Sequence, residues 1–588
     1  MYRKSVFFLL VAGTGILLLY YLFLCYSYPY ANTIAWIKEH FDTAYNIASI
    51  DQDYFTQFQY TLFWQWATLI TLLYWIVVLC LWHKYTQIVL YLSVVKSESI
   101  LLFENLQKQY HVLTTYQKIV ILVLYIGALV HHIYYCIEIP FNVDEVFAYN
   151  YFVHQSPLVP LFYYPEPNNH ILFNLFASVF DLFIHDGCWT MRLPSLLANL
   201  CLLTIIFIYL LVRVNFRVAL VATICCIISF PTSIYATQGR GYMLMSMWAI
   251  LAILSFIEWK RSSRKIYLLS YIASSIAGFY THSTFLYCFT GLFLWEMFYI
   301  IKTQNLEFIK TALWTNVLIL SSVLLLYSPI LAFSGWKALI DNRWIASNQT
   351  YFLKMFFVQL LEGLSLLTDV WHKVYILIFF LGLFIGFVFR KFIHLVFIRQ
   401  LVAFTFFQVV GIILILLILR RLPPLRVWTY LTFWYPITLS VVLYLLSVWI
   451  KKQYVFIALS LCLIISVSLQ SIHSYQQNLT SQNGPFSQKF YTSLQRTVDY
   501  IFQKNPQKIF VNEHWFQFYL RNQQIKRQLE TPYIDMYLPR QEIVYDFVIF
   551  SPDMVSHKLP DTFSLQSYRL ITEFEGSKIY ERIPQQKE

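Results

Sequence analysis

Long apolar runs recur along the first 471 residues, separated by short polar segments. Most runs have about 17 to 25 residues, the length of an α-helix that crosses a bilayer. Neither the alternating pattern of a membrane β-barrel nor an internal repeat is visible. The pattern predicts a polytopic α-helical membrane protein with about thirteen transmembrane helices, at residues 5–28, 61–82, 119–139, 193–212, 218–236, 242–259, 266–283, 284–301, 311–333, 373–389, 401–419, 428–449 and 453–471.

Basic residues favour one side of these predicted helices. With the N-terminus in the cytoplasm, most Lys and Arg residues before position 472 fall in cytoplasmic segments, as the positive-inside rule predicts. The net charge of +12 therefore follows from membrane topology and does not indicate a nucleic acid partner. The same topology places the C-terminus outside the cytoplasm.

The composition changes after residue 471, where charged residues become frequent. A helical pattern at residues 490–502 and strand patterns at 508–511, 545–550 and 568–583 predict a small soluble α/β domain without a visible catalytic motif. We expect three parts: an added N-terminal two-helix unit with a cytoplasmic loop at 1–118, a transmembrane domain at 119–471, and an extracytoplasmic α/β domain at 472–588.

An acidic pair, Asp144 and Glu145, follows the third predicted helix on its outer side. Ionisable groups close to hydrocarbon are costly and commonly mark a working site. One carboxylate could accept a proton from a hydroxyl, while the pair could also hold a divalent cation. A structural alternative is a capping box, with Asn142 as the cap and Glu145 three residues later. That alternative explains Glu145 better than Asp144.

A polar run, Asn168, Asn169 and His170, follows a proline-rich stretch and precedes an apolar segment. Because prolines interrupt helices, these residues should lie on a shaped loop or at the start of a short helix at the membrane surface. They face the same side as the acidic pair. Helix capping by the asparagines and an interfacial position for the histidine are the structural alternatives.

Several arginines lie on the outer side against the charge bias. Arg240 lies in the turn YATQGRGYMLM, where two glycines permit close backbone approach. Three more arginines, Arg420, Arg421 and Arg426, surround a pair of prolines after the eleventh predicted helix. A guanidinium can bind phosphate through two hydrogen bonds, so these residues predict an anionic ligand, with lipid headgroup contact as the alternative.

Together these segments resemble the GT-C class of membrane glycosyltransferases, specifically glycosyltransferase family 39 and the dolichyl-phosphate-mannose protein mannosyltransferases, with relatives that transfer aminoarabinose to lipid A. The resemblance covers residues 119 to 450. It is carried by the acidic pair after a helix, PNNHILFNLF, MRLPSLLAN with Arg192, ATQGRGYMLM, and YTHS with His282.

The resemblance implies a GT-C fold and transfer of a sugar, with inversion, from a polyprenyl-phosphate donor to a lipid, glycan or protein acceptor outside the cytoplasm. Asp144 would be the general base and Glu145 its partner, while Arg240 would bind the donor phosphate, assisted by Arg420, Arg421 or Arg426. A divalent cation, Mg²⁺ or Mn²⁺, is left open. The remaining candidates for the donor or acceptor pocket are Asn168, Asn169, His170, Arg192, Gln238, Tyr242 and His282.

Two features depart from that family's pattern. The acidic pair follows the third predicted helix rather than the first, so residues 1–118 look like an addition, and PNNH replaces the HPP or KPP of better known members. The rival functions are a transporter or flippase for lipid-linked glycans and an enzyme of the O-antigen ligase or polymerase type. A transporter should carry mid-span charges and broken helices, whereas these predicted spans are nearly uncharged. We expect an integral protein of a bacterial inner membrane.

Overall fold

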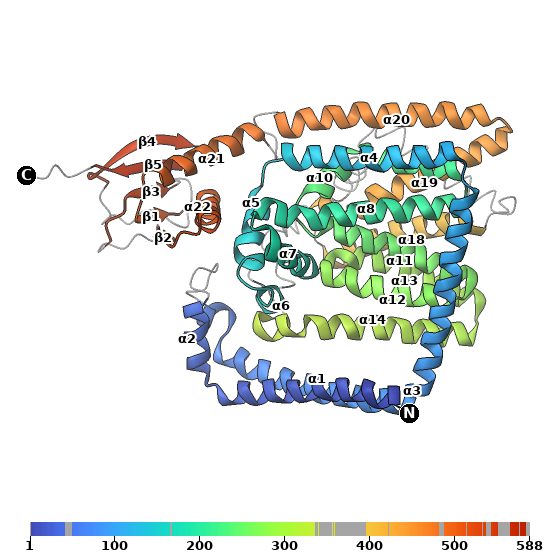
Figure 1. Cartoon of the computed structure of the whole chain (residues 1–588), viewed down its shortest axis with the longest axis horizontal. Coiled ribbons are helices and arrows are strands. Elements are labelled where there is room, and N and C mark those ends of the chain that lie inside the picture. Colours follow the sequence, from blue (N-terminus) through green and yellow to red (C-terminus); the bar gives the residue numbers. More distant parts are fainter. Residues whose placement is uncertain are drawn as a thin grey trace, which may run out of the picture.

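The computed structural model describes residues 2–40, 50–164, 167–335, 396–420, 423–480, 487–512, 514–531, 533–536, 543–550, 565–574 and 577–583, with single residues at 339, 356 and 358. A helical bundle carries a small sheet domain at one end (Figure 1). Its elements before the sheet domain are α1 (Tyr2–Ser27), α2 (Tyr30–His40), η2 (Ile50–Tyr54), α3 (Gln57–Val112), α4 (Thr115–Glu138), α5 (Val143–Ala148), η3 (Tyr149–Val153), α6 (Val159–Phe162), α7 (Ile171–Ile184), α8 (Gly187–Arg213), α9 (Phe216–Ile228), α10 (Phe230–Thr237), α11 (Tyr242–Ser262), α12 (Lys265–Thr281), η4 (Ser283–Phe285), α13 (Leu286–Thr303), α14 (Leu306–Phe333), α18 (Val396–Leu419), η5 (Leu425–Trp428), α19 (Tyr430–Ile450), α20 (Gln453–Tyr475) and η6 (Gln476–Thr480).

Each predicted span in the described ranges falls on helix, but α1 (predicted span 5–28) and α12 (266–283) are not among the helices that are long and apolar enough to cross a membrane, whereas the unpredicted part of α3, Trp82–Val112, is. Ten helices in the described ranges are long and apolar enough to cross a membrane, or eleven if the bent pair α9 and α10 forms one span. The predicted number of thirteen is therefore not confirmed, and the span at residues 373–389 lies outside the described residues. Helix α11 is the most buried of these candidates, with 83% of its apolar window inside the molecule.

Helix α3 joins α1 and α2 to the rest of the bundle. Thr56 and Gln59 close a capping box at its start, and neither glycine nor proline interrupts its 56 residues. Its first part runs beside α1, and its second part crosses the bundle to reach α4 (Figure 1). The Glu98 carboxylate accepts a hydrogen bond of 2.8 Å from the Ile266 amide at the start of α12. The segment predicted as a cytoplasmic loop is thus helical up to Val112.

The bend between α9 and α10 measures 67°. Pro231 stands in the first turn of α10, where it lacks an N–H group to continue the hydrogen bonds of α9. The sequence predicted one span at residues 218–236, and the structure divides it at Ser229. The bend directs α10 toward the turn at residues 238–241.

Helices α13 and α18 approach closely at two glycines. A side chain carbon on Gly411 would lie 3.0 Å from the Gly291 nitrogen, and one on Gly291 would lie 2.5 Å from the Gln408 side chain oxygen and 2.9 Å from its Cα. The Gln408 amide also donates hydrogen bonds to the Tyr287 carbonyl and the Tyr430 hydroxyl. This contact fixes α18 against the bundle.

The predicted α/β domain is present at the C-terminal end. Its sheet has the order β2-β1-β3-β5-β4, with β1 parallel to β2 and β3, and with β5 antiparallel to β3 and β4. The sequence prediction omitted α22 and β2. The elements are α21 (Gln488–Gln503), β1 (Lys508–Val511), α22 (His514–Arg527), β2 (Tyr533–Met536), β3 (Phe547–Phe550), β4 (Tyr568–Phe574) and β5 (Ser577–Arg582).

The glycine contact gives a test of the bundle. We expect Gly291→Ala to destabilise the protein by about 1–3 kcal/mol, because the added carbon overlaps the backbone and side chain of Gln408. Gly127→Ala in α4 is the matched control, since nothing lies within 4 Å of its added carbon. Thermal unfolding in detergent measures both, and equal midpoints would contradict the packing described for α13 and α18.

Candidate active site

The acidic pair lies in the turn that follows α4. Pro140 cannot continue that helix, and α5 begins two residues after Phe141 with Asn142 as its cap. The Asn142 side chain oxygen accepts hydrogen bonds from the amides of Asp144 (3.0 Å) and Glu145 (3.2 Å), and the Glu145 carboxylate accepts one of 3.1 Å from the Asn142 amide. The capping box is therefore present.

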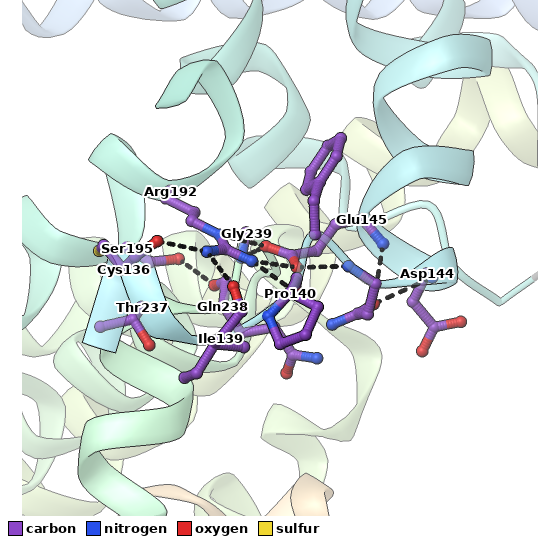
Figure 2. Close-up of polar contacts among 12 residues, drawn as sticks. Cys136, Ile139, Pro140, Asp144, Glu145, Arg192, Ser195, Thr237, Gln238 and Gly239 are labelled. Atoms are coloured by element: carbon purple, nitrogen blue, oxygen red, sulfur yellow. Dashed lines mark hydrogen bonds and ion pairs between the residues drawn. The ribbon is translucent and has the colours of Figure 1, made fainter. Parts of the chain in front are cut away.

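Glu145 also pairs with Arg192 of α8 in the interior, where their side chains are 0% and 1% exposed. Arg192 Nε and Nη2 donate to the two carboxylate oxygens at 3.2 and 3.0 Å. Its other N–H groups donate to the carbonyls of Cys136 (2.6 Å), Ile139 (2.7 Å) and Pro140 (2.8 Å) at the end of α4 (Figure 2). All five guanidinium donors are thus occupied.

The last acceptor position of Glu145 is filled by the amide of Gly239. A side chain carbon on Gly239 would lie 2.4 Å from Met191 Cβ and 2.9 Å from the carboxylate, so this close approach requires glycine. Each carboxylate oxygen then accepts two hydrogen bonds. Glu145 joins the end of α4, α8 and the 238–241 turn, and it keeps no free acceptor for a substrate.

Asp144 lies in a different environment. Its side chain is 39% exposed and forms an ion pair with Arg240 through Oδ2, while Oδ1 has no hydrogen bond to any residue that the structure describes. Figure 2 shows its carboxylate pointing away from the Arg192 group. Asn168 connects the two partners, because its amide donates to the Asp144 carbonyl (2.9 Å) and accepts from Arg240 Nη2 (2.6 Å).

Arg240 is buried but incompletely bonded. Its side chain is 5% exposed, and its Nε group has no partner within the described part of the chain. The guanidinium carbon lies 5.2 Å from the centre of the Tyr242 ring, and that of Arg426 lies 6.0 Å from the same ring. The two arginines therefore share one aromatic neighbour.

Two histidines pack beside this ring. Ring centres are 5.1 Å apart for His170 and Tyr242, 4.6 Å for His170 and His282, and 5.3 Å for Tyr242 and His282. The Gly241 amide donates to His170 Nδ1 at 2.7 Å, so the neutral ring carries its proton on Nε2. That nitrogen is buried and has no partner in the described ranges.

Both histidines are held neutral at pH 7. Burial, with His282, Arg240 and Arg426 nearby, lowers the pKa of His170 well below its usual value. Burial and the same two arginines lower the pKa of His282 to about 3. His170 thus presents an N–H donor beside the arginines without adding charge.

Asn169 and Gln238, two further residues predicted for the pocket, make hydrogen bonds within the protein that hold its loops. Both N–H groups of the Asn169 side chain donate to carbonyls of its own loop, at Pro160 (2.9 Å) and Tyr163 (3.0 Å). Gln238 supplies its backbone carbonyl to the Ser195 hydroxyl (2.8 Å) and to the Arg240 amide (2.7 Å). These residues shape the loops that carry Asn168 and Arg240.

Of the predicted arginines after α18, only Arg426 is placed beside the cluster. Arg420 ends α18 in a left-handed conformation, with φ of 49°, and its exposed side chain makes no hydrogen bond or ion pair with the described residues. Arg421 lies outside the described residues. No three His, Cys, Asp or Glu side chains in the described ranges gather closely enough to hold a metal ion.

No protein-family model and no curated protein matches the chain. Among solved structures it is similar to ArnT from Cupriavidus metallidurans bound to undecaprenyl phosphate, with a TM-score of 0.50, 11% identity, and coverage of 79% of this chain and 98% of that one. For ArnT in the apo state the TM-score is 0.49 and the identity 13%, with coverage of 79% of this chain and 97% of that one. For the oligosaccharyltransferase AglB from Archaeoglobus fulgidus with an inhibitory peptide and a dolichol-phosphate, the TM-score is 0.44 and the identity 9%, with coverage of 74% of this chain and 70% of that one. The predicted GT-C fold is confirmed.

The two acids give the next prediction. Glu145→Gln leaves the buried Arg192 without a counter-charge, and we expect it to cost about 3–5 kcal/mol of stability. Asp144→Asn changes a partly exposed side chain and should cost about 1 kcal/mol or less. Thermal unfolding of both purified variants measures the difference. Similar losses of stability would show that the structural role is not confined to Glu145.

Proposed function

We propose that this protein transfers a sugar from a polyprenyl-phosphate donor to an acceptor outside the cytoplasm, with inversion, and that Asp144 is the general base. The observation that carries the proposal is an ion pair between a partly exposed carboxylate and a buried arginine; among the described residues, one carboxylate oxygen and the arginine Nε group have no hydrogen-bond partner. The GT-C fold supports it, since ArnT of the same fold was solved with undecaprenyl phosphate.

The arginine cluster suits the leaving group of this reaction. A sugar phosphate gains negative charge on its phosphate oxygens as the glycosidic bond breaks, and prepositioned donors stabilise that charge. Within the part of the chain that the structure describes, Arg240 Nε and His170 Nε2 have no partner, and Arg426 lies beside the Tyr242 ring. We assign the donor phosphate to this group of three side chains.

Asp144 then acts on the acceptor. Without donor, its carboxylate is neutralised by Arg240. A phosphate bound to Arg240 competes for the same guanidinium and leaves the carboxylate free to take a proton from the acceptor hydroxyl. Glu145, which accepts four hydrogen bonds, has no part in this proton transfer and positions Asp144 through the shared turn.

The transporter alternative is less well supported. The described ranges contain one broken span, but its break at Ser229 and Phe230 carries no ionisable group. The acidic pair lies in the first turn of the short helix α5, and Arg240 and the histidines lie at helix ends. Chemistry on a lipid-borne substrate at the membrane surface uses such a placement. The proposal includes an inner-membrane location with this surface and the C-terminal domain outside the cytoplasm.

Transfer assays test the proposal. Membranes are incubated with radiolabelled polyprenyl-phosphate sugars and candidate lipid, glycan and protein acceptors. Asp144→Asn should lower transfer by about 10²–10⁴-fold while donor binding is kept, because only the base is lost. Arg240→Ala should weaken donor binding as well. Equal transfer by the wild type and Asp144→Asn would overturn the assignment of the base.

The chain supplies a matched control for the arginines. Arg420→Ala removes an exposed guanidinium that contacts none of the cluster within the described residues, so transfer should stay near the wild-type rate. Arg426→Ala removes the cation beside Tyr242 and should weaken donor binding. Equal effects of these two variants would contradict a phosphate site centred on Tyr242.

A further inference from the structure

The C-terminal domain packs directly on the acidic turn. Helix α22 contacts α5 and η3, and the Phe518 ring lies 5.1 Å from that of Phe147 and 5.9 Å from that of Tyr151. The Asn150 side chain donates a hydrogen bond of 2.9 Å to the Phe518 carbonyl. Figure 1 shows α22 at the end of the bundle where α5 lies. A segment about 370 positions later in the chain (|i−j| = 368) thus covers the turn.

Tyr519 contacts the backbone at the entrance to α5. Its hydroxyl donates a hydrogen bond to the carbonyl of Phe141, the residue before the helix cap Asn142. The Tyr519 side chain is buried, with 4% exposure. The direction of the backbone into the cap is therefore set by a side chain of the other domain.

Tyr491 of α21 packs against Tyr519. Their ring centres are 6.3 Å apart, and the Tyr491 side chain is buried, with 8% exposure. Burial and the nearby charges of Asp144 and Glu145 raise the pKa of Tyr491, so its hydroxyl lies close to the acidic pair. The two tyrosines therefore form one contact surface.

A third contact fixes the end of α4. The Gln488 side chain donates to the Glu138 carbonyl at 3.0 Å and to its carboxylate at 2.7 Å. Helix α5 has six residues, which is too short to be stable alone. The position of α5 therefore depends on the groups that hold its start, which are the ion pair of Arg192 and Glu145 and the side chains of the C-terminal domain.

We propose that Tyr519 is a positioning residue of the active site, which holds residues 138–145 so that the Asp144 carboxylate meets Arg240. The catalytic consequence rests on the proposed function. The restraint on the turn does not, because it follows from the hydrogen bond of Tyr519 to Phe141 and from the packing of α22 on α5.

Amide hydrogen exchange of the full-length protein tests the restraint. The variant is Tyr519→Phe, with Tyr500→Phe on α21 as the control, where the ring contacts Lys504. We expect Tyr519→Phe to exchange about fivefold faster over residues 138–145, since one hydrogen bond is lost. Tyr500→Phe should match the wild type. Unchanged exchange over 138–145 in Tyr519→Phe would overturn the proposal.

Kinetics distinguish positioning from general support. If the transfer reaction is as proposed, Tyr519→Phe should lower kcat about fivefold and leave the donor KM unchanged, because the phosphate-binding side chains are on other segments. A rise in donor KM with unchanged kcat would overturn the positioning role. Absence of transfer by the wild type would refute the proposed function but not the exchange result, so the two failures are separable.

Discussion

The buried ion pair between Glu145 and Arg192 determines how the end of the bundle that carries α5 is built. Charges at this depth are stable only when paired and fully hydrogen-bonded, and here the carboxylate accepts four hydrogen bonds while the guanidinium donates five. Together they join the end of α4, the start of α5, α8 and the 238–241 turn. Asp144 directly precedes Glu145 on a six-residue helix, so its side chain points in another direction. Glu145 holds the structure together, and Asp144 can therefore contact a substrate.

The same contrast separates the two buried arginines. Arg192 has no unused donor, whereas the Nε group of Arg240, beside Tyr242 and Arg426, has no partner among the described residues. Under the proposed function, a phosphate binds Arg240 without breaking the framework. Phosphate binding and proton acceptance would then be connected through one exchangeable ion pair, while the restraints on Asp144 come from the saturated pair of Glu145 and Arg192 and from Tyr519 of the C-terminal domain.

Local patterns in the sequence predicted much of this arrangement. The apolar runs gave the helices, and the spacing of Asn142 and Glu145 gave the capping box. Arg192 was identified, but as a pocket residue, because its contact with Glu145 joins positions 47 apart and no local period encodes such a pairing. Helix α22 was missed because its apolar residues gather in its first half and face two domains. The contact of Tyr519 with Phe141 depends on docking of a separate domain, which leaves no motif.

A cryo-EM structure of the full-length protein with polyprenyl phosphate in a lipid nanodisc tests most directly whether phosphate binds Arg240 and releases Asp144. We expect phosphate density within hydrogen-bond distance of Arg240 Nε and beside Arg426. We also expect the Asp144 carboxylate to have left Arg240, and the Glu145 and Arg192 pair to be unchanged from the structure described above. Phosphate bound at Arg192, or an Asp144 and Arg240 pair still intact with phosphate elsewhere, would contradict it.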